Sequence, residues 1–387
     1  MISNSRDNCP GCMACYNICP KQAIEIVEND EGFLYPVINE EKCIKCNLCS
    51  NICNKQASVN YDEKHIKILA AWSNDETTRL KSSSGGCFTE FAKYIFDNKG
   101  VVFGAGYNKE FEVTHKEAHD LDDLNDLRGS KYVQSIIGDC YKKVKSYLES
   151  NKLVLFSGTP CQVAGLYKFL NRNYDNLYTC DLVCHGVPSP KVFRKYKLYL
   201  QKKYNSDINT INFRDKVKGW KIFSFTTIFK NGKKYSDTLS NDKYIKGFLN
   251  NIYLRPSCYD CKYSKIPRQA DISLGDFWGV QEKYSELDDD KGTSLLLINS
   301  KKGEELLDKC SNNMFIKEIN DLEYVIKYNP CIIGSVKMPN NRNKFFEQID
   351  KFEFDELIKN NLPKESKLKA FINRCKNFIK TRLLNSK

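Results

Sequence analysis

The sequence predicts two unlike folded parts: a small cysteine-rich α+β domain followed by a larger mixed α/β domain, with a helical tail at the end. Two regular cysteine blocks lie within the first 60 residues, and beyond them short apolar runs alternate with helical segments. At 387 residues the chain is long enough for more than one hydrophobic core. We expect four segments, with these boundaries: 1–60, 61–150, 151–335 and 336–387.

Composition and charge exclude several classes of protein. The hydrophobic fraction of 41% is typical of a folded globular protein. The net charge of +12 is spread thinly along the chain, so we expect no nucleic-acid partner. The opening residues lack the apolar core of a signal peptide, and no apolar run is long enough to span a membrane, so a cytoplasmic location is expected. Tightly clustered cysteines there favour metal binding or redox work over disulfides.

Each cysteine block has the spacing C-x2-C-x2-C-x3-C, which Pro20 follows in the first block and Asn54 in the second. In this pattern three cysteines wrap one iron–sulfur cubane, while the fourth ligates the other cubane. We expect the fourth cysteine of each block to begin a helix. The spacing predicts two crossed ligand sets, the first being Cys9, Cys12, Cys15 and Cys53, and the second Cys19, Cys43, Cys46 and Cys49.

Between the blocks, residues 23–26 and 35–38 are expected to form a hairpin that turns through Glu31 and Gly32. This is the arrangement of a bacterial dicluster ferredoxin. The alternative is a pair of zinc sites, but zinc takes four ligands with a wider gap between its cysteine pairs. Two complete runs of four thiols therefore indicate a ferredoxin domain that holds two 4Fe–4S clusters.

Beyond residue 60 the pattern is that of an α/β domain. Strands are expected at residues 65–72, 101–107, 153–156 and 177–183, and helices at 87–98 and from about 160 to 170. Asn231 and Gly232 separate two further runs, 223–230 and 233–238, which predict a β-hairpin.

Several motifs then occur in a fixed order. They are S-S-S-G-G at 82–86, S-G-T-P-C-Q at 157–162, D-L-V-C-H-G-V-P-S-P at 181–190, C-x2-C at 258–261 and D-x4-D-F-W-G at 271–279. Over residues 1–335 the chain resembles the coenzyme F-420 hydrogenase/dehydrogenase beta-subunit family with a fused ferredoxin domain. The resemblance implies an iron–sulfur flavoprotein oxidoreductase that passes electrons between 4Fe–4S clusters, a flavin (FAD) and a diffusible carrier or organic acceptor.

The resemblance also implies a third 4Fe–4S cluster, whose ligands would be Cys161, Cys184, Cys258 and Cys261. Three alternatives remain open: Cys161 as a lone nucleophile, a zinc ion on the C-x2-C pair, or buried structural thiols. Cys180 could also replace Cys184 as a ligand. We expect the remaining cysteines to be free thiols: Cys87, Cys140, Cys310, Cys331 and Cys375.

Two segments are candidates for flavin binding. Ser83, Ser84, Gly85 and Gly86 precede a predicted helix, where backbone N–H groups can face a pyrophosphate, although an ordinary N-cap and turn would look the same. The second segment offers a cation, a ring and an amide, or simply a solvated loop; its residues are Lys131, Tyr132 and Gln134. No G-x-G-x-x-G follows a strand, so a dinucleotide site of the Rossmann kind is not indicated.

His185 follows a predicted cluster ligand and is a candidate catalytic proton donor, or a group that simply hydrogen-bonds near the cluster. Residues 364–387 form a basic amphipathic helical pattern. That helix could cover the protein's own core, dock an acidic redox partner or lie peripherally on a membrane. We expect a ferredoxin-like donor or redox partner protein and a small-molecule acceptor. The rival function is a non-catalytic electron-transfer subunit that lacks flavin.

Overall fold

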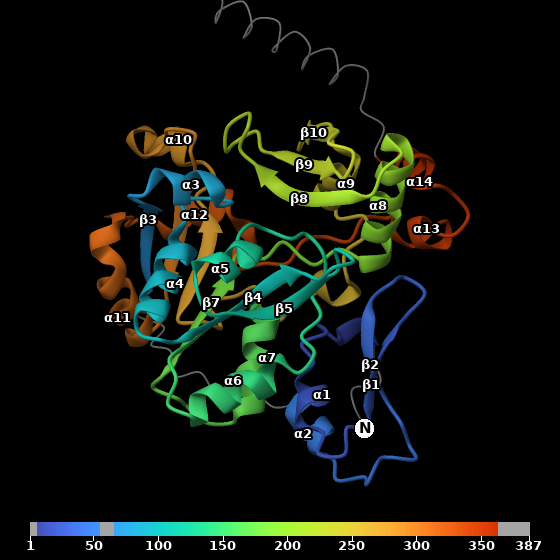
Figure 1. Ribbon diagram of the computed structural model, residues 1–387, viewed down its shortest axis with the longest axis horizontal. Coiled ribbons are helices and arrows are strands. Elements are labelled where there is room, and N and C mark those ends of the chain that lie inside the picture. The colour runs from blue at the N-terminus through green and yellow to red at the C-terminus, as the bar shows by residue number, and fades with distance from the viewer. Residues whose placement is uncertain (1–5, 55–65, 363–387) are drawn as a thin grey trace, which may run out of the picture.

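The computed structural model describes residues 6–54 and 66–362, which form a small N-terminal domain and a larger α/β body (Figure 1). In the N-terminal domain β1 and β2 pair as an antiparallel hairpin, and Gly32 in its turn has a φ of 86°. The predicted hairpin is therefore confirmed. The domain's helices and strands are α1 (Ala14–Ile18), β1 (Ile24–Glu28), β2 (Leu34–Ile38) and α2 (Leu48–Asn54).

The cysteines do not begin helices as expected. The first helix starts earlier, at Ala14, because Met13 takes a left-handed conformation directly after Cys12. Cys19 therefore sits at the C-terminal cap of α1, and Cys53 lies in the last turn of α2. The expected helix starts are wrong, but each fourth cysteine still follows the third by one helical turn.

A mixed eight-stranded sheet forms the centre of the larger body, with strand order β13-β3-β12-β11-β7-β6-β4-β5. The inner pairs β11–β7, β7–β6 and β6–β4 are parallel, and the outer pairs are antiparallel. The mixed α/β prediction is confirmed. The strands are β3 (Lys67–Ser73), β4 (Val101–Tyr107), β5 (Val113–Ala118), β6 (Val154–Gly158), β7 (Leu177–Leu182), β11 (Ile272–Asp276), β12 (Ser294–Ile298) and β13 (Met314–Glu318).

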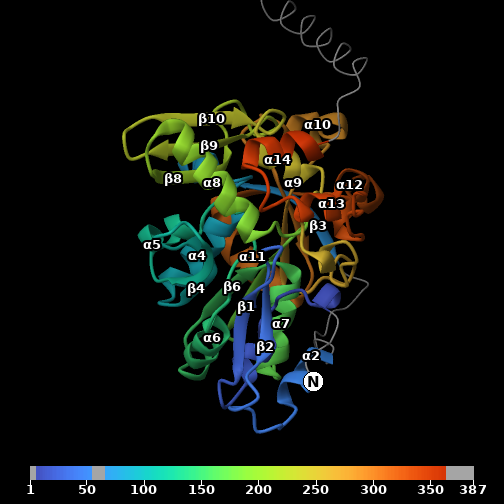
Figure 2. The same cartoon turned by 90° about the vertical axis from the view of Figure 1, so that its right-hand side faces the viewer.

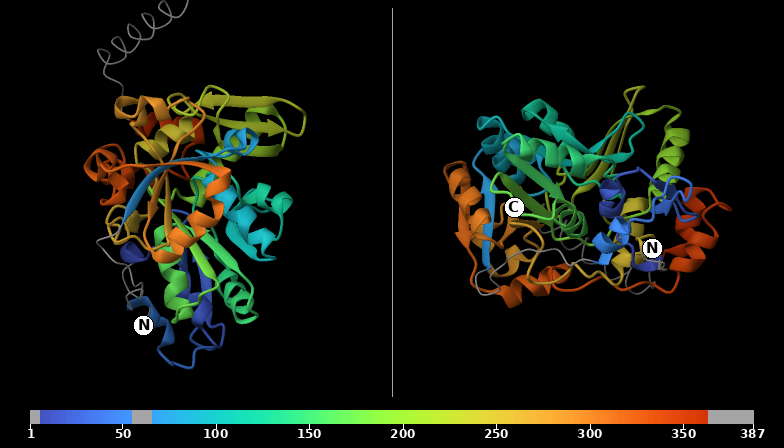
Figure 3. Two further views of the ribbon diagram at one scale, coloured as in Figure 1. Left: turned by 90° about the vertical axis from the view of Figure 1, so that its left-hand side faces the viewer. Right: turned by 90° about the horizontal axis from the view of Figure 1, so that it is seen from below.

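Helices cover both faces of this sheet (Figure 3). On one face α4 and α11 pack through Phe91 and Leu306, and on the other α6 and α7 pack through Val144 and Leu166. The helices of the body are α3 (Glu76–Lys81), α4 (Cys87–Asp97), α5 (Leu121–Leu127), α6 (Cys140–Glu149), α7 (Pro160–Leu170), α8 (Pro190–Tyr204), α9 (Lys243–Leu249), α10 (Val280–Lys283), α11 (Lys301–Cys310), α12 (Leu322–Tyr328), α13 (Arg342–Glu347) and α14 (Phe354–Asn361).

The N-terminal domain shares its apolar core with α6 and α7, and it lies beside them in Figure 2. Met13, Ala14 and Ile24 belong to the same buried cluster as Leu166 and Tyr141. Burial of apolar surface at this junction holds the two parts against each other. The cysteine loops are thereby placed next to the first turn of α7.

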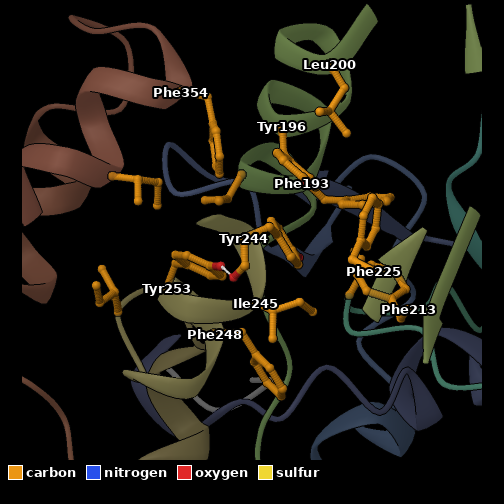
Figure 4. Close-up of a cluster of buried hydrophobic side chains, with 14 of the residues drawn as sticks. Phe193, Tyr196, Leu200, Phe213, Phe225, Tyr244, Ile245, Phe248, Tyr253 and Phe354 are labelled. Atoms are coloured by element: carbon orange, nitrogen blue, oxygen red, sulfur yellow. Dashed lines mark hydrogen bonds between the residues drawn. The ribbon is translucent and has the colours of Figure 1, made fainter. Parts of the chain in front are cut away.

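A second layer contains a three-stranded sheet of β8 (Ile208–Asp215), β9 (Ser224–Phe229) and β10 (Lys234–Thr238). The β9–β10 pair confirms the predicted second hairpin. Aromatic side chains from this sheet, α8, α9 and α14 form a buried cluster that includes Tyr196, Tyr244 and Phe354 (Figure 4). Helix α14 is therefore part of this core. The basic amphipathic pattern expected at 364–387 lies outside the described residues.

Within the described residues, no helix is long enough and apolar enough to cross a bilayer.

Candidate iron–sulfur centres and cofactor cavity

The structure brings the four cysteines of the first set together. Burial, together with the neighbouring thiols Cys9 and Cys53, raises the pKa of Cys12 to about 11. The pKa of Cys15 is also raised, first by burial and then by Cys12, Cys9 and Cys53. Cys53 comes from α2, so the helix that carries the last two cysteines of the second block reaches back to the first loop. This is the crossed arrangement expected of a dicluster ferredoxin.

The second set lies at the outer end of the N-terminal domain. Cys46 is exposed, and the other three cysteines are partly buried. The Cys19 sulfur accepts a hydrogen bond from the backbone N–H of Ala23 at 3.2 Å. Among the described residues, no three Cys, His, Asp or Glu side chains are placed as ligands of a single metal ion.

The four cysteines of the third set converge from distant parts of the chain. Cys161 lies in the first turn of α7, Cys184 follows β7, and Cys258 and Cys261 lie in and after a short 3-10 helix. The pKa of Cys161 is raised by burial and then by Cys261 and Cys184. The pKa of Cys184 is raised by burial and then by Cys258 and Cys261. These mutual effects show that the four thiols share one buried environment.

Two polar groups already lie against these sulfurs. The Thr159 hydroxyl is 3.1 Å from the Cys161 sulfur, and the backbone N–H of Val187 donates to the Cys258 sulfur at 3.4 Å. Thr159 also caps α7, in a box with Gln162, which explains why the helix starts here. Hydrogen bonds of this kind stabilise a thiolate, the form that binds metal.

Cys180 does not join the third set. It is fully buried in the core on the α4 and α11 side of the sheet, where Cys87 and Cys310 lie close to it. Cys184 lies beyond the end of β7, where the chain has left the strand, so it does not share the buried surroundings of Cys180.

Cys331 is the unexpected neighbour of the third set. Its pKa is raised first by burial and then by Cys261, and it in turn raises the pKa of Cys184. The sequence offers no local signal for this proximity, because Cys331 has no partner at metal-ligand spacing. Cys375, which was expected to be a free thiol, lies outside the described residues.

The first and third sets are neighbours across the domain junction. The Tyr141 hydroxyl lies 2.8 Å from the carbonyl oxygen of Cys12 and 2.7 Å from that of Gln162. Gly165 faces the same loop, and a Cβ there would lie 2.9 Å from the Cβ of Cys12. The pKa of Tyr263 is raised by burial and then by Cys12 and Cys161, so its ring lies beside both sets.

The serine–glycine turn predicted to bind a pyrophosphate already has partners inside the protein. The Ser83 hydroxyl oxygen accepts from the backbone N–H and the hydroxyl of Ser130, at 2.8 and 3.0 Å. Ser84 donates to the carbonyl of Thr293, and the Gly85 N–H donates to the Ser294 hydroxyl.

Glycine is required at position 85 by close packing, because a Cβ would lie 2.4 Å from the carbonyl oxygen of Ala71 in β3. Gly86 is the N-cap of α4 with a φ of 91°, which favours glycine. The contacts of this turn are therefore those of an N-cap and a supporting loop.

The three other flavin candidates are placed in different surroundings. Tyr132 stacks on Phe248 with ring centroids 4.6 Å apart. Gln134 accepts hydrogen bonds from the N–H of Leu34 and from Arg255, so it faces the N-terminal domain. Lys131 lines a cavity.

That cavity has a volume of about 900 Å³ and lies between β4, the 125–131 loop and β8. Aromatic rings line part of it: Tyr107, Phe111 and Phe213. Cations dominate the rest, with a single acid, Asp126, which pairs with one of them; they are Lys81, Lys109, Lys116, Arg128 and Lys131.

Among the described residues, two cationic side chains of this cavity lack a full set of charge or hydrogen-bond partners. Burial lowers the pKa of Lys131 to about 7, so this ammonium lacks a full counter-charge. The Arg128 Nε is buried and has no hydrogen-bond partner in the part of the chain that the structure describes. A ligand with an aromatic ring and phosphate groups would satisfy both the rings and the cations.

His185 is half-buried, with its Nε2 2.6 Å from the Asn251 side-chain oxygen. Burial lowers its pKa, so the ring is neutral near pH 7. The Asn251 amide donates to the Lys337 carbonyl, which orients its oxygen toward the histidine. These contacts agree with the hydrogen-bonding alternative for His185.

The fold and the cysteine sets define an iron–sulfur electron-transfer protein. Residues 8–57 match the 4Fe-4S dicluster domain, and residues 151–322 match the C-terminal region of the coenzyme F420 hydrogenase/dehydrogenase beta subunit. The chain therefore carries a 4Fe–4S dicluster domain and a segment similar to the C-terminal region of that beta subunit, which together support an iron–sulfur electron-transfer oxidoreductase.

Comparison with curated proteins finds no match. Among solved structures, a chain of the F420-reducing NiFe hydrogenase complex from Methanosarcina barkeri is similar at 20% identity, with a TM-score of 0.47. The match covers 74% of this chain and 92% of that chain.

Proposed function

We propose that this oxidoreductase relays electrons between three 4Fe–4S clusters, an FAD and a small-molecule acceptor. The observation that carries the proposal is the convergence of the third cysteine set beside the first. Three separate segments bring four thiols into one buried site, and Tyr141 joins the Cys12 and Gln162 carbonyls between the two sets. Such convergence favours a bound cluster over a lone nucleophile, because a nucleophile needs one thiol and a nearby base.

The residues present fit cubanes at all three sets. A 4Fe–4S cluster takes four thiolates, and each set supplies four. Burial alone would keep the thiols of the first and third sets protonated, since it raises their pKa. Iron offsets this cost because metal binding takes up the thiolate form. Cys331 stands near the third set as a fifth thiol.

The cavity lined by Lys131 fits an FAD. Its rings offer apolar surface for an isoalloxazine or adenine, and its cations suit a pyrophosphate. When bound, a flavin exchanges single electrons on one side and electron pairs on the other, which links clusters to an organic acceptor. The hydrogen bond between Ser83 and Ser130 fixes the loop that carries Lys131. The hydrogen bond between His185 and Asn251 fixes the residue that follows Cys184.

The exposed second set is the proposed entry point for a ferredoxin-like donor or redox partner, because Cys46 lies at the surface of the domain. The rival function is an electron-transfer subunit without flavin. It would leave the cation-rich cavity without an aromatic phosphate ligand.

Iron and flavin counts on anaerobically purified protein test the relay. Three cubanes predict about twelve irons per chain and two predict about eight. Cys161→Ser should remove about four irons, while Cys180→Ser, matched in residue type but located across the sheet, should remove none. About eight irons in the wild type would overturn the third cluster.

Flavin extraction from the same sample tests the cavity. We expect about one FAD per chain, and Lys131→Met combined with Arg128→Met should lower that amount several-fold. A wild-type protein that neither contains FAD nor binds added FAD would instead favour the flavin-free subunit.

A further inference from the structure

Arg255 connects the two buried cysteine sets. Its backbone is hydrogen-bonded to the loops that carry the third set. The Arg255 carbonyl accepts from the N–H of Cys258, and the Arg255 N–H donates to the carbonyl of Val187. Its side chain belongs to the first set, because Nε donates to the carbonyl of Cys9 at 2.7 Å and Nη1 to that of Leu34 at 3.1 Å.

The guanidinium is completely enclosed. The relative exposure of Arg255 is 0%, its carbon lies 4.1 Å from the centre of the Tyr35 ring, and Nη1 also donates to Gln134. Gly11, within the cluster-binding loop, leaves the necessary space: a Cβ there would lie 3.1 Å from the guanidinium carbon. No carboxylate pairs with this charge among the contacts of the described residues.

One nitrogen of Arg255 is left over. Nη2 is buried and has no hydrogen-bond partner among the described residues. Leaving a charged donor unpaired in the interior is costly, so an acceptor beyond these residues is expected. The sulfur atoms of a cluster bound by Cys9 and its set are acceptors and carry negative charge.

We propose that Arg255 is a positioning residue that favours reduction of the cluster held by the first cysteine set and locks that cluster beside the third set. Reduction adds one electron, and hence one negative charge, to the cluster. A fixed positive charge in a buried junction stabilises the reduced form more than the oxidised form. The cluster at the exposed second set lacks this neighbour and keeps a different potential.

The inference rests on the proposed function for the cluster at Cys258, but not for the one at Cys9, which belongs to the dicluster domain already shown. The test is therefore a potentiometric titration of the N-terminal clusters followed by electron paramagnetic resonance. Arg255→Met should lower the midpoint potential of one cluster by a shift equal to at least about a tenfold change in its reduction equilibrium. The second cluster should not move.

Arg342→Met is the matched control. Arg342 also joins the two domains, through paired hydrogen bonds to Glu31 at 2.8 and 2.6 Å, but its hydrogen bonds to Glu31 and to the Leu254 carbonyl do not reach the loop of the first cysteine set. It should weaken docking without moving either potential. Arg255→Lys, which keeps the charge, should stay close to the wild-type potential.

Unchanged potentials in Arg255→Met, or an equal shift in Arg342→Met, would overturn the proposal. Arg255→Gln is the second neutral variant should the methionine protein lose iron. A loss of about four irons in both neutral variants but not in Arg255→Lys would also support a charge requirement. An equal loss of iron in Arg255→Met, Arg255→Gln and Arg255→Lys would refute the charge requirement. Wild-type iron and flavin counts decide the relay separately, so failure of one proposal is distinguishable from failure of the other.

Discussion

At the scale of single residues, burial of charged groups changes their pKa values. Lys131 is the clearest case, because its amine lines the cavity yet donates to the carbonyls of Asp126 and Arg128. Burial outweighs the attraction of Asp126 and, together with the repulsion from Lys116, lowers its pKa to about 7. The lysine is thus charged below about pH 7 and neutral above it.

This titration predicts pH-dependent binding of an anionic ligand. FAD affinity of the flavin-free protein should fall on the order of tenfold between about pH 6 and pH 8, because the positive charge of Lys131 is lost as the pH rises through its pKa. Fluorescence quenching measures it. Lys131→Met should flatten the profile, whereas Lys109→Met, at an exposed position of the same cavity, should weaken binding and keep the slope. A steep profile in Lys131→Met would contradict the assignment.

At the scale of elements, an ion pair joins the two sheets. Arg214 near the end of β8 is bound by both oxygens of Asp276 at the end of β11, each at 2.9 Å, and Trp220 donates to the same carboxylate. The Arg214 side chain is only 3% exposed. Asp276 therefore anchors β8 to the central sheet.

Asp276→Asn should lower the free energy of unfolding by about 3–5 kcal/mol, because it leaves the buried Arg214 charge unpaired. Urea denaturation measures the change. Lys202→Met is the matched control: it removes an ion pair with Glu353 whose side chains are 67% and 69% exposed, and should cost less than about 1 kcal/mol. Similar costs for the two variants would show that burial of the Arg214 pair is unimportant.

At the scale of the whole molecule, the N-terminal domain sits closely on α7. Gly165 is the point of closest approach, where a Cβ would lie 2.9 Å from both the Cys12 Cβ and the Tyr141 hydroxyl. Around the same junction, Arg342 pairs with Glu31, and Arg194 pairs with Glu28. Contacts spread over the whole junction keep the first and third cysteine sets together.

Gly165→Ala should destabilise the protein by about 1–3 kcal/mol through overpacking. The sign is informative, since alanine in an isolated helix would instead stabilise by about 1 kcal/mol. Urea unfolding gives the energy, and hydrogen exchange in α1 and α6 reports loosening of the junction. Gly104→Ala is the control, because its nearest neighbour would be 3.5 Å away. A stabilised Gly165→Ala would show that the two parts do not pack this tightly.

Local pattern was sufficient to predict the dicluster domain, both hairpins and the strands around β4, β6 and β7. Cysteine spacing and apolar periodicity are short-range signals, and the structure forms those elements within a few residues of the expected ranges. The exact helix starts at Cys19 and Cys53 were missed because the left-handed Met13 lets α1 begin earlier.

Which groups meet depends on how the whole chain packs. Cys180 and Cys184 are four residues apart, yet the strand turns Cys180 into the opposite core. Gln134 belongs to the domain junction, and Cys331 and Arg255 reach the cysteine sets from segments with no local metal signal. The 4Fe–4S dicluster could be predicted from the order of residues alone, because three of the four expected ligands of each N-terminal set are spaced within one loop. The surroundings of those clusters depend on long-range packing, which no local pattern encodes.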